Sequence, residues 1–284
     1  MKKYTIIADS SCDLRSTDIK HENIQFITTP IIYNIGGVDH YDEEDVVVKD
    51  MMDKMKASKT WPKTACPSPE TFADQMRAAT DNVIVVTLSS KISGTNQSAN
   101  LAAETVRAEQ PSKNIFILDS LTCSGGMARI IFKLVDLISE GKLSFEEITQ
   151  TITEYQKKGK IRFLLNDLTN LVKSGRMSKV AGIVTSIIPI KLICGDNGEG
   201  EIKKVKSVIG FKKGIEQLAQ PPGEHLESHG KDNIIVITHC NNEESANSIK
   251  STLESKFGYT NIKILLMRGV ASVLANEKGI AVAY

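Results

Sequence analysis

Short apolar runs alternate with stretches of helical periodicity along this chain. In the first half, three runs rich in Val, Ile and Leu each end in small polar residues: Tyr4–Ala8, Val83–Leu88 and Ile115–Leu118. Such runs are typical of strands buried on both faces of a parallel sheet. Apolar residues at helical spacing predict helices between and after them, over Asp42–Lys56, Pro69–Ala79, Thr95–Arg107 and Ile130–Glu140.

Turn and capping residues in this half predict a hairpin and the start of one helix. The apolar stretch Ile24–Tyr33, followed by Gly36-Gly37 and Val38–Tyr41, predicts a hairpin beside the sheet. Ser68 precedes Pro69, which is the sequence of an N-cap followed by a first-turn proline.

The second half repeats the alternation of strands and helices. Strands are predicted at Ile161–Leu165, Pro189–Cys194, Glu201–Ser207, Ile234–Thr238, Ile262–Leu266 and Gly279–Ala283. Helices are predicted over Asp167–Lys173, Ser178–Ser186 and Glu243–Phe257. A chain of 284 residues is long for one domain. We therefore expect two α/β domains, residues 1–158 and 159–284.

Composition narrows the class of protein. The 35 basic and 34 acidic side chains give a net charge of +1, which argues against binding to nucleic acid or to an anionic membrane surface. No segment has the roughly 20 apolar residues of a membrane-spanning helix. The five cysteines are dispersed and form no metal-binding motif, so we expect a cytoplasmic protein with reduced thiols and without a metal or other cofactor.

Small polar residues gather where predicted strands end, which is where ligands bind in open α/β sheets. Ser93-Gly94-Thr95 is the most informative group, because glycine allows close approach and the helix that follows offers free N–H donors to an anion. Spacing alone does not separate this role from simple helix capping by Ser93 or Thr95. Arg176, between Gly175 and Ser178, is open to two interpretations: an anion contact in a cleft, or a solvated residue after a helix end.

Catalytic groups are sparse. His239 follows a predicted strand, so a Ser93–His239 dyad of a serine hydrolase is conceivable. The sequence contains no oxyanion motif and no orienting carboxylate at a recognisable spacing. The acidic residues, such as Asp42–Asp45, are expected on solvated helix faces.

Several of these stretches together resemble the DegV family of bacterial fatty-acid-binding proteins. The matching pieces are Ala8-Asp-Ser-Ser11, Thr64-Ala-Cys-Pro-Ser68, Leu88-Ser-Ser-Lys-Ile-Ser-Gly-Thr95, Leu118-Asp-Ser120, Leu171-Val-Lys-Ser-Gly-Arg-Met-Ser178 and Ile188-Pro-Ile-Lys191. The resemblance implies two α/β domains with a ligand tunnel at and near the cleft between them. It implies a binding protein without catalytic residues, which presents a long-chain fatty acid to a dihydroxyacetone-kinase-like fatty acid kinase for phospholipid synthesis.

The resemblance also assigns residues. It places the fatty-acid carboxylate on Thr64, the Ala65 backbone, Ser93, Gly94 and Thr95. For the acyl tail, the apolar residues proposed are Phe26, Ile31, Ile32 and Phe72.

This chain departs from the family pattern at three positions. Ala65 stands where a serine is common, Lys206 aligns with a usual arginine, and Glu277 aligns with a usual histidine near the C-terminus. Lys206 loses the bidentate fork of arginine, and Glu277 would repel a phosphate. Arg176, Lys206, Glu277 and His239 are therefore expected to face the cleft or a partner, with the kinase step altered. Alternatives are a lipid sensor without kinase hand-over and, behind it, a serine hydrolase.

Overall fold

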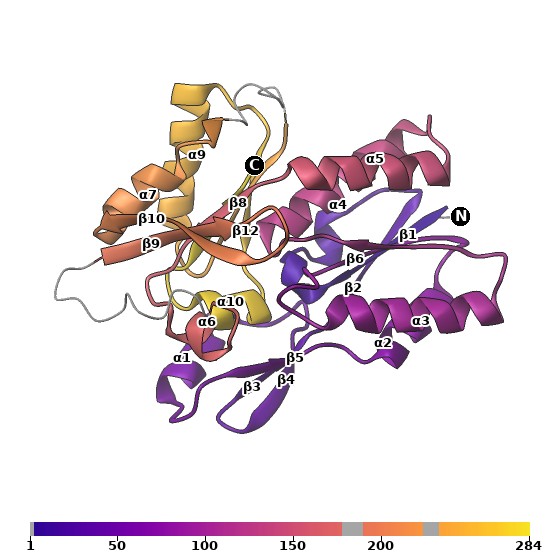
Figure 1. Ribbon diagram of the computed structural model, residues 1–284, viewed down its shortest axis with the longest axis horizontal. Helices are drawn as coiled ribbons and strands as arrows, with labels where there is room; N and C mark the ends of the chain where they lie inside the picture. Colours follow the sequence, from indigo (N-terminus) through magenta and orange to yellow (C-terminus); the bar gives the residue numbers. More distant parts are fainter. Residues whose placement is uncertain (1–2, 178–189, 224–232) are drawn as a thin grey trace.

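The computed structural model describes residues 3–177, 190–223 and 233–284. The helix predicted over Ser178–Ser186 lies outside these ranges. Within them, the strands form three sheets: a four-stranded parallel sheet, a small three-stranded antiparallel sheet and a six-stranded mixed sheet (Figure 1).

The parallel sheet has the order β2-β1-β6-β7, with all neighbouring strands parallel. Its strands are β1 (Tyr4–Asp9), β2 (Ile24–Thr29), β6 (Asn82–Thr87) and β7 (Asn114–Asp119). Helices α2 (Pro69–Ala78) and α3 (Thr95–Glu109) cover one face, and α4 (Gly125–Glu140) and α5 (Phe145–Lys158) cover the other (Figure 1). Adjacent residues of β1 enter these two layers, since Ile6 packs with the α4 side and Ile7 with the α2–α3 side. The prediction of buried parallel strands is confirmed.

The predicted hairpin is only partly correct. The stretch Ile24–Tyr33 is not one strand, because it is interrupted at Pro30, which lacks a backbone N–H. Its first part is β2 of the parallel sheet. Its second part, β3 (Ile32–Ile35), pairs with β4 (Val38–Tyr41) and with β5 (Lys63–Ala65), a three-residue strand that the sequence did not indicate.

Helix α1 (Val48–Ala57) begins six residues later than predicted. Asp42, expected on a solvated helix face, is fully buried instead. The reason is that its carboxylate accepts backbone hydrogen bonds from Gly269 at 2.7 Å and Val270 at 3.0 Å. The start of α2 is as predicted: Pro69 is its first-turn residue, and the Ser68 hydroxyl accepts from the Thr71 N–H at 3.2 Å.

The six-stranded sheet has the order β10-β9-β8-β13-β11-β12. Its strands are β8 (Ile161–Leu164), β9 (Ile190–Asp196), β10 (Ile202–Ile209), β11 (Ile235–His239), β12 (Ile262–Leu266) and β13 (Ile280–Ala283). Helices α7 (Phe211–Leu218) and α9 (Glu243–Phe257) pack on one face. The short helices α6 (Thr169–Lys173) and α10 (Gly269–Ala275) lie between this sheet and the three-stranded sheet (Figure 1).

Helix α4 joins the two halves, because it packs on β6 of the parallel sheet and on β11 and β13 of the six-stranded sheet. One apolar cluster consequently runs from Ile6 through Ile131 to Ala283. The change from one sheet system to the other falls between the end of α5 and the start of β8. A domain boundary at 158/159 agrees with this change and stays a prediction.

Candidate functional site

An apolar cavity lies between the two domains. Its walls come from loops of the N-terminal domain and from β8, β10, β13, α6 and α10 of the C-terminal domain. The apolar lining includes Leu88, Ile92, Cys123, Ile161, Phe163, Leu165, Leu171, Ile202, Met267, Val270, Ala271, Leu274, Ala275 and Ala281. The polar groups on its lining are Ser11, Ser124 and Arg176. A mostly apolar wall with a few polar groups suits a long apolar ligand that has one polar end.

The residues expected to hold an acyl tail lie elsewhere. Phe26, Ile31, Ile32 and Phe72 are not part of the wall of this cavity. Phe72 is fully buried in the layer of α2 and α3, on the face of the parallel sheet opposite α4. This cavity gives the tail assignment no support, because apolar character alone does not tell which side of a sheet a residue faces, and the assignment stays a prediction.

Arg176 is the charged residue on the lining of the cavity, and it reaches from the C-terminal domain to the N-terminal one. Its Nε donates to the Ile92 carbonyl at 3.1 Å, and its Nη2 donates to the Thr64 hydroxyl at 3.0 Å. A third bond, from Nη1 to the Ser174 carbonyl at 3.2 Å, holds the guanidinium to its own loop. The interpretation of Arg176 as a solvated residue is therefore wrong, since the side chain bridges the two domains in the cleft.

The Ser93-Gly94-Thr95 loop lies next to the Thr64 loop. The hydroxyls of Ser93 and Thr95 are 2.8 Å apart, and the Thr95 N–H donates to the Ser93 Oγ at 3.3 Å. Gly94 lies so close to the second loop that a Cβ built on it would be 3.4 Å from the Cys66 Sγ. Thr95 is fully buried, whereas Ser93 is half-buried and Gly94 is exposed.

Strand β5 positions the Thr64 loop. Thr64 pairs with Tyr33 and Ala65 pairs with Ile32 of β3, so the three-stranded sheet fixes both residues. Four of the five residues predicted to bind a head group thus lie around one contact zone, formed by Thr64, Ser93, Gly94 and Thr95 with Arg176 across it. The exposed Ala65 follows directly after Thr64 on the same strand.

Arg176 brings a positive charge to this contact zone. Burial lowers the pKa of Arg176, and no carboxylate contributes to the shift. An arginine side chain remains protonated in proteins despite such a shift. Among the described residues, the three groups that accept its hydrogen bonds are two carbonyls and a hydroxyl, all of them uncharged. Within the described ranges, therefore, no carboxylate neutralises this guanidinium.

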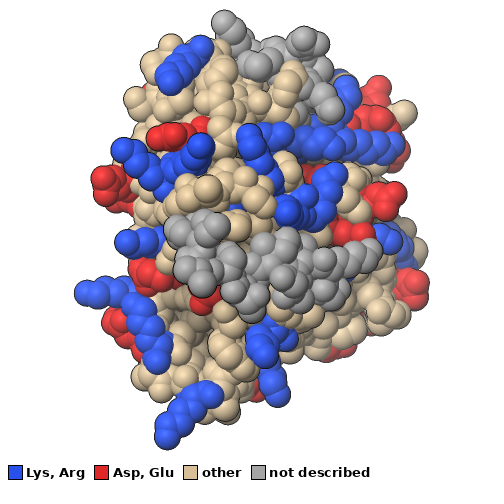
Figure 2. Space-filling view, turned by 60° about the vertical axis from the view of Figure 1, so that its left-hand side comes forward, with Lys and Arg blue, Asp and Glu red and all other residues tan. Residues whose placement is uncertain are grey.

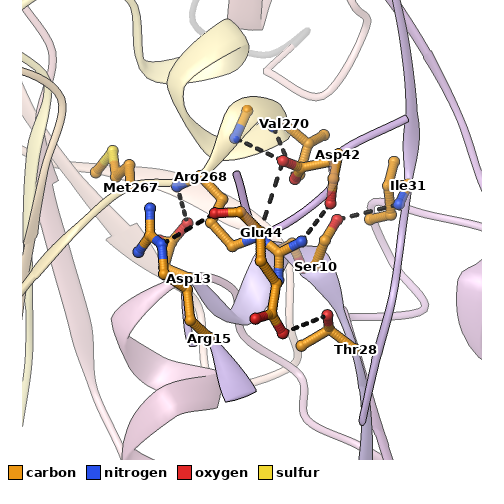
Figure 3. A network of polar contacts seen from close by, with 12 residues as sticks. Ser10, Asp13, Arg15, Thr28, Ile31, Asp42, Glu44, Met267, Arg268 and Val270 are labelled. Carbon is orange, nitrogen blue, oxygen red and sulfur yellow. Dashed lines mark hydrogen bonds and ion pairs between the residues drawn. The ribbon is translucent and has the colours of Figure 1, made fainter. Parts of the chain in front are cut away.

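A second polar network, which the sequence did not reveal, fixes the wall of the cavity (Figure 3). Arg268, 1% exposed, donates through its side chain to the carbonyls of Leu14 and Asp42 and through its N–H to the Asp13 carboxylate. The Asp42 carboxylate in turn holds the first N–H groups of α10. Gly269 is required at this contact, because a Cβ would lie 2.7 Å from the Asp42 Oδ1. The network thereby fixes α10, four residues of which line the cavity.

Two further carboxylates at the ends of the parallel sheet are buried. The Asp9 carboxylate accepts from the Leu88 N–H at 2.6 Å and from the Ser11 N–H at 3.1 Å, so it holds two residues of the cavity wall. The Asp13 carboxylate accepts a hydrogen bond from the hydroxyl of Ser124, a third wall residue. Burial raises the pKa of Asp9 to about 6 and that of Asp13 to about 7.

The remaining candidate residues lie apart from this zone. His239 is buried at the end of β11, its Nδ1 accepts from the Asn242 N–H at 3.1 Å, and burial lowers its pKa. Neither of these contacts involves Ser93, so the described bonds give no support to a Ser93–His239 dyad. Glu277 lies 3.5 Å from Lys56 of α1.

Lys206 lies on the exposed edge strand β10 and donates to Gln217 of α7 at 2.5 Å. Its neighbours Lys203 and Lys204 are exposed as well. Figure 2 shows Lys and Arg side chains spread over one face of the molecule. The described contacts do not bring Lys206 and Glu277 together, since one meets α7 and the other meets α1.

No three His, Cys, Asp or Glu side chains in the described ranges are grouped so that they could hold a metal ion. No helix within those ranges has the length and the apolar character needed to cross a membrane.

Comparison with known proteins identifies the family. A family model described as an uncharacterised protein of the DegV family matches residues 3–284. The chain belongs to the DegV family. A DegV domain-containing protein of Streptococcus gordonii is 32% identical over 281 residues, which cover 99% of this chain and 98% of the relative. The family expected from the sequence motifs is confirmed.

Solved structures of the family share the fold over its whole length. The B3 protein of the Streptococcus pneumoniae fatty acid kinase, loaded with linoleic acid, is 32% identical with a TM-score of 0.91, and 99% of each chain is covered. A DegV family protein of Ruminococcus gnavus with vaccenic acid is 26% identical with a TM-score of 0.91, covering 100% of this chain and 99% of that one. A relative from Eubacterium eligens, loaded with heptadecanoic acid, has a TM-score of 0.87 at 26% identity, with 99% and 98% covered. The expectation of two α/β domains is confirmed by these matches.

Proposed function

We propose that this protein binds a long-chain fatty acid, with the carboxylate at the Arg176 end of the interdomain cavity and the tail along its apolar wall. One observation carries the proposal: Arg176 brings a positive charge to a mostly apolar cavity, and its acceptors among the described residues are all uncharged. Relatives of the same fold hold linoleic, vaccenic and heptadecanoic acids, which supports the choice of ligand.

In this proposal the head group meets Arg176, the Thr64 hydroxyl, the Ser93 hydroxyl and the backbone of Ala65 and Gly94. Thr95 is a positioning residue, because it is fully buried and its hydroxyl is bonded to the Ser93 Oγ at 2.8 Å. A charge-assisted hydrogen bond to the carboxylate contributes about 1.5–3 kcal/mol. Burial of a sixteen-carbon tail contributes about 12 kcal/mol before ordering costs, at about 0.8 kcal/mol per methylene. The tail therefore dominates affinity, and the polar end selects acids.

The test compares a fatty acid with its methyl ester, which has the same tail but no charge. Mass spectrometry of lipid extracted from natively purified protein first identifies the natural ligand. Titration of delipidated protein is then expected to show tight binding of the acid and clearly weaker binding of the ester. A protein that carries no fatty acid and takes up none, or that binds acid and ester equally, would contradict the proposal.

We further propose that the bound acid is presented to a fatty acid kinase, and that this chain itself performs no catalysis. The support is the relative named as the B3 protein of such a kinase. Glu277 lies beside Lys56, which partly offsets its charge, and Lys206 keeps a positive charge on an exposed strand. ATP-dependent formation of acyl phosphate, with loaded protein and a cognate kinase, tests this step. Binding without any acyl phosphate would favour a lipid sensor.

A further inference from the structure

A polar hollow adjoins the apolar cavity at Arg176. The lining of this hollow consists of Lys91, Ile92, Ser174, Gly175, Arg176, Met177, Glu201 and Ile202. Three of these residues, Ile92, Arg176 and Ile202, line the apolar cavity as well. The two spaces are therefore neighbours, and Arg176 borders both. A fatty acid whose carboxylate lies at Arg176 does not need the hollow, which calls for an explanation of this second space.

The charged residues on the hollow differ from those that the sequence associated with the kinase step. Lys206 and Glu277 are not part of its lining, and their contacts are with Gln217 and Lys56. Lys91, by contrast, lines the hollow and is exposed. A charge on a partner-facing head group would therefore meet Lys91 before it meets Lys206 or Glu277.

The loop that carries Lys91 is held in place from both domains. Ser89 is fully buried, and its hydroxyl donates to the Gly200 carbonyl at 2.8 Å and accepts from the Lys91 N–H at 3.2 Å. On the other side of Lys91, the Ile92 carbonyl accepts from the Arg176 Nε at 3.1 Å. The backbone of Lys91 is thus fixed close to Arg176, while its side chain has a long and flexible stem.

Glu201 is the acidic residue on the described lining of the hollow. Its carboxylate accepts from the Asn197 Nδ2 at 3.0 Å, which holds it on the turn between β9 and β10. Lys91 favours an anion in the hollow and Glu201 opposes one. The two residues therefore give predictions of opposite sign for any ligand with a negative group in this space.

Phosphorylation of the head group creates a need for such a space. In the proposed kinase step, a carboxylate oxygen of the fatty acid attacks the γ-phosphorus of ATP. The bond from that phosphorus to the oxygen bridging it to the β-phosphate breaks, and ADP leaves with the electron pair. The acyl phosphate then carries a phosphoryl group beyond its carbonyl and more negative charge than the acid. The tail and the carbonyl keep their places only if this group has room beyond Arg176.

We propose that the polar hollow receives the phosphoryl group of the acyl phosphate, and that Lys91 favours the phosphorylated head group over the free one. This inference rests on the proposed fatty-acid function and adds a specificity-determining residue to it. Lysine suits this role because its ammonium group acts as a point charge toward phosphate oxygens. Arg176 contacts the head group in both forms.

The experiment compares palmitic acid with its β-ketophosphonate analogue, in which a methylene group replaces the bridging oxygen so that the ligand does not hydrolyse. Both ligands are titrated by calorimetry, at constant ionic strength, into delipidated wild-type protein and Lys91→Gln. The variant is expected to weaken binding of the phosphonate roughly tenfold and to change binding of the acid little. An unchanged ratio of the two dissociation constants in Lys91→Gln would overturn the proposal.

Two further variants locate the effect. Lys203→Gln is the matched control, because Lys203 is exposed and follows directly after Ile202 but does not line the hollow. An equal loss of phosphonate binding in this control would show a general charge effect and overturn the site. Glu201→Gln removes the opposing charge and is expected to strengthen phosphonate binding, with little change for the acid. Weaker phosphonate binding in Glu201→Gln would contradict the placement of the phosphoryl group in the hollow.

The wild-type titrations separate this inference from the proposed function. Wild-type protein that binds neither ligand would contradict fatty-acid binding, and the phosphoryl site with it. Wild-type protein that binds the acid but not the phosphonate would leave fatty-acid binding intact and overturn the phosphoryl site alone. Inorganic phosphate is also titrated into protein loaded with palmitic acid. Saturable binding that is lost in Lys91→Gln would assign the hollow to free phosphate and overturn its assignment to the acyl phosphate.

Discussion

Two arginines of the C-terminal domain cross to the N-terminal domain, and their surroundings differ. Arg268 is 1% exposed, and its Nε lies 3.9 Å from the Asp42 carboxylate, with a second carboxylate accepting its backbone N–H (Figure 3). Arg176 is half-buried and, within the described part of the chain, donates to two carbonyls and a hydroxyl. The described residues thus supply a counter-charge to the first arginine and uncharged acceptors to the second.

This difference separates a structural role from a binding role. A buried arginine near a protein carboxylate has a counter-charge within the protein and fixes the elements it connects, here Leu14, Asp42 and the start of α10. An arginine held in place by neutral acceptors is positioned equally well but keeps its charge for a ligand. Arg176 is also on the wall of the apolar cavity, whereas Arg268 lies behind that wall. Substitution of both arginines by methionine tests this contrast.

The largest effect is expected from Arg268→Met. The variant leaves Asp42 buried without its counter-charge, and breaking a buried pair in this way costs about 3–5 kcal/mol. Urea denaturation measures the loss in the free energy of unfolding. Arg176→Met, the matched substitution in a more exposed setting, is expected to lose about 1 kcal/mol. Equal losses in the free energy of unfolding of the two variants would contradict the special structural role of Arg268.

The second prediction concerns affinity. Arg176→Met is expected to raise the fatty-acid dissociation constant roughly 10- to 100-fold, since a charge-assisted hydrogen bond contributes about 1.5–3 kcal/mol. Affinity for the methyl ester is expected to change little, because the ester has no charge to lose. Lys206→Met removes a charge from the exposed strand β10 and serves as the control. If this control weakens binding as much as Arg176→Met, the head group is not at the Arg176 end.

The third prediction is a pH dependence of the network behind the wall. Burial raises the pKa of Asp9 to about 6 and that of Asp13 to about 7, above the usual value near 3.8. Between about pH 4 and pH 7 the folded protein therefore holds more protons than the unfolded chain. These two groups make stability fall as pH rises through that window, by at most about 1.4 kcal/mol per pH unit each.

Asp13→Asn isolates this contribution. Urea denaturation across the window is expected to give a flatter pH dependence for the variant than for the wild type. A variant whose stability changes with pH in parallel with the wild type would show that Asp13 is ionised at all these pH values in the folded protein.

Most of the fold could be predicted because its strands and long helices have strong periodicity. β12 and α9 have the predicted bounds, and both ends of β1, β6 and β7 lie within one residue of the prediction. The elements that were missed are short or rich in small residues, such as β5 and α10, whose positions depend on tertiary contacts. The break at Pro30 was visible in the sequence and should have ended the strand there.

The site was predictable only in part, because some of its contacts join residues that are far apart in the sequence. Thr64, Ser93 and Arg176 belong to recognisable motifs, and the structure brings them together. The contact of Arg268 with Asp42 joins residues 226 positions apart, and no local pattern indicates it. The walls of the cavity come from loops of one domain and from strands and helices of the other, so apolar residues such as Phe72 could not be assigned to a side.

The smallest effect, at Ser93, separates binding from hydrolysis. Ser93→Ala removes one uncharged hydroxyl, so we expect fatty-acid affinity to fall by about 0.5–1.5 kcal/mol, roughly two- to tenfold. Ser90→Ala, in the same loop but exposed, is the control and is expected to change nothing. Ester turnover is assayed in parallel. Because the Ser93 hydroxyl is bonded to Thr95 and not to His239, we expect none in either protein. Turnover that disappears with Ser93 would instead make this residue a nucleophile and the polar end of the cavity an active site.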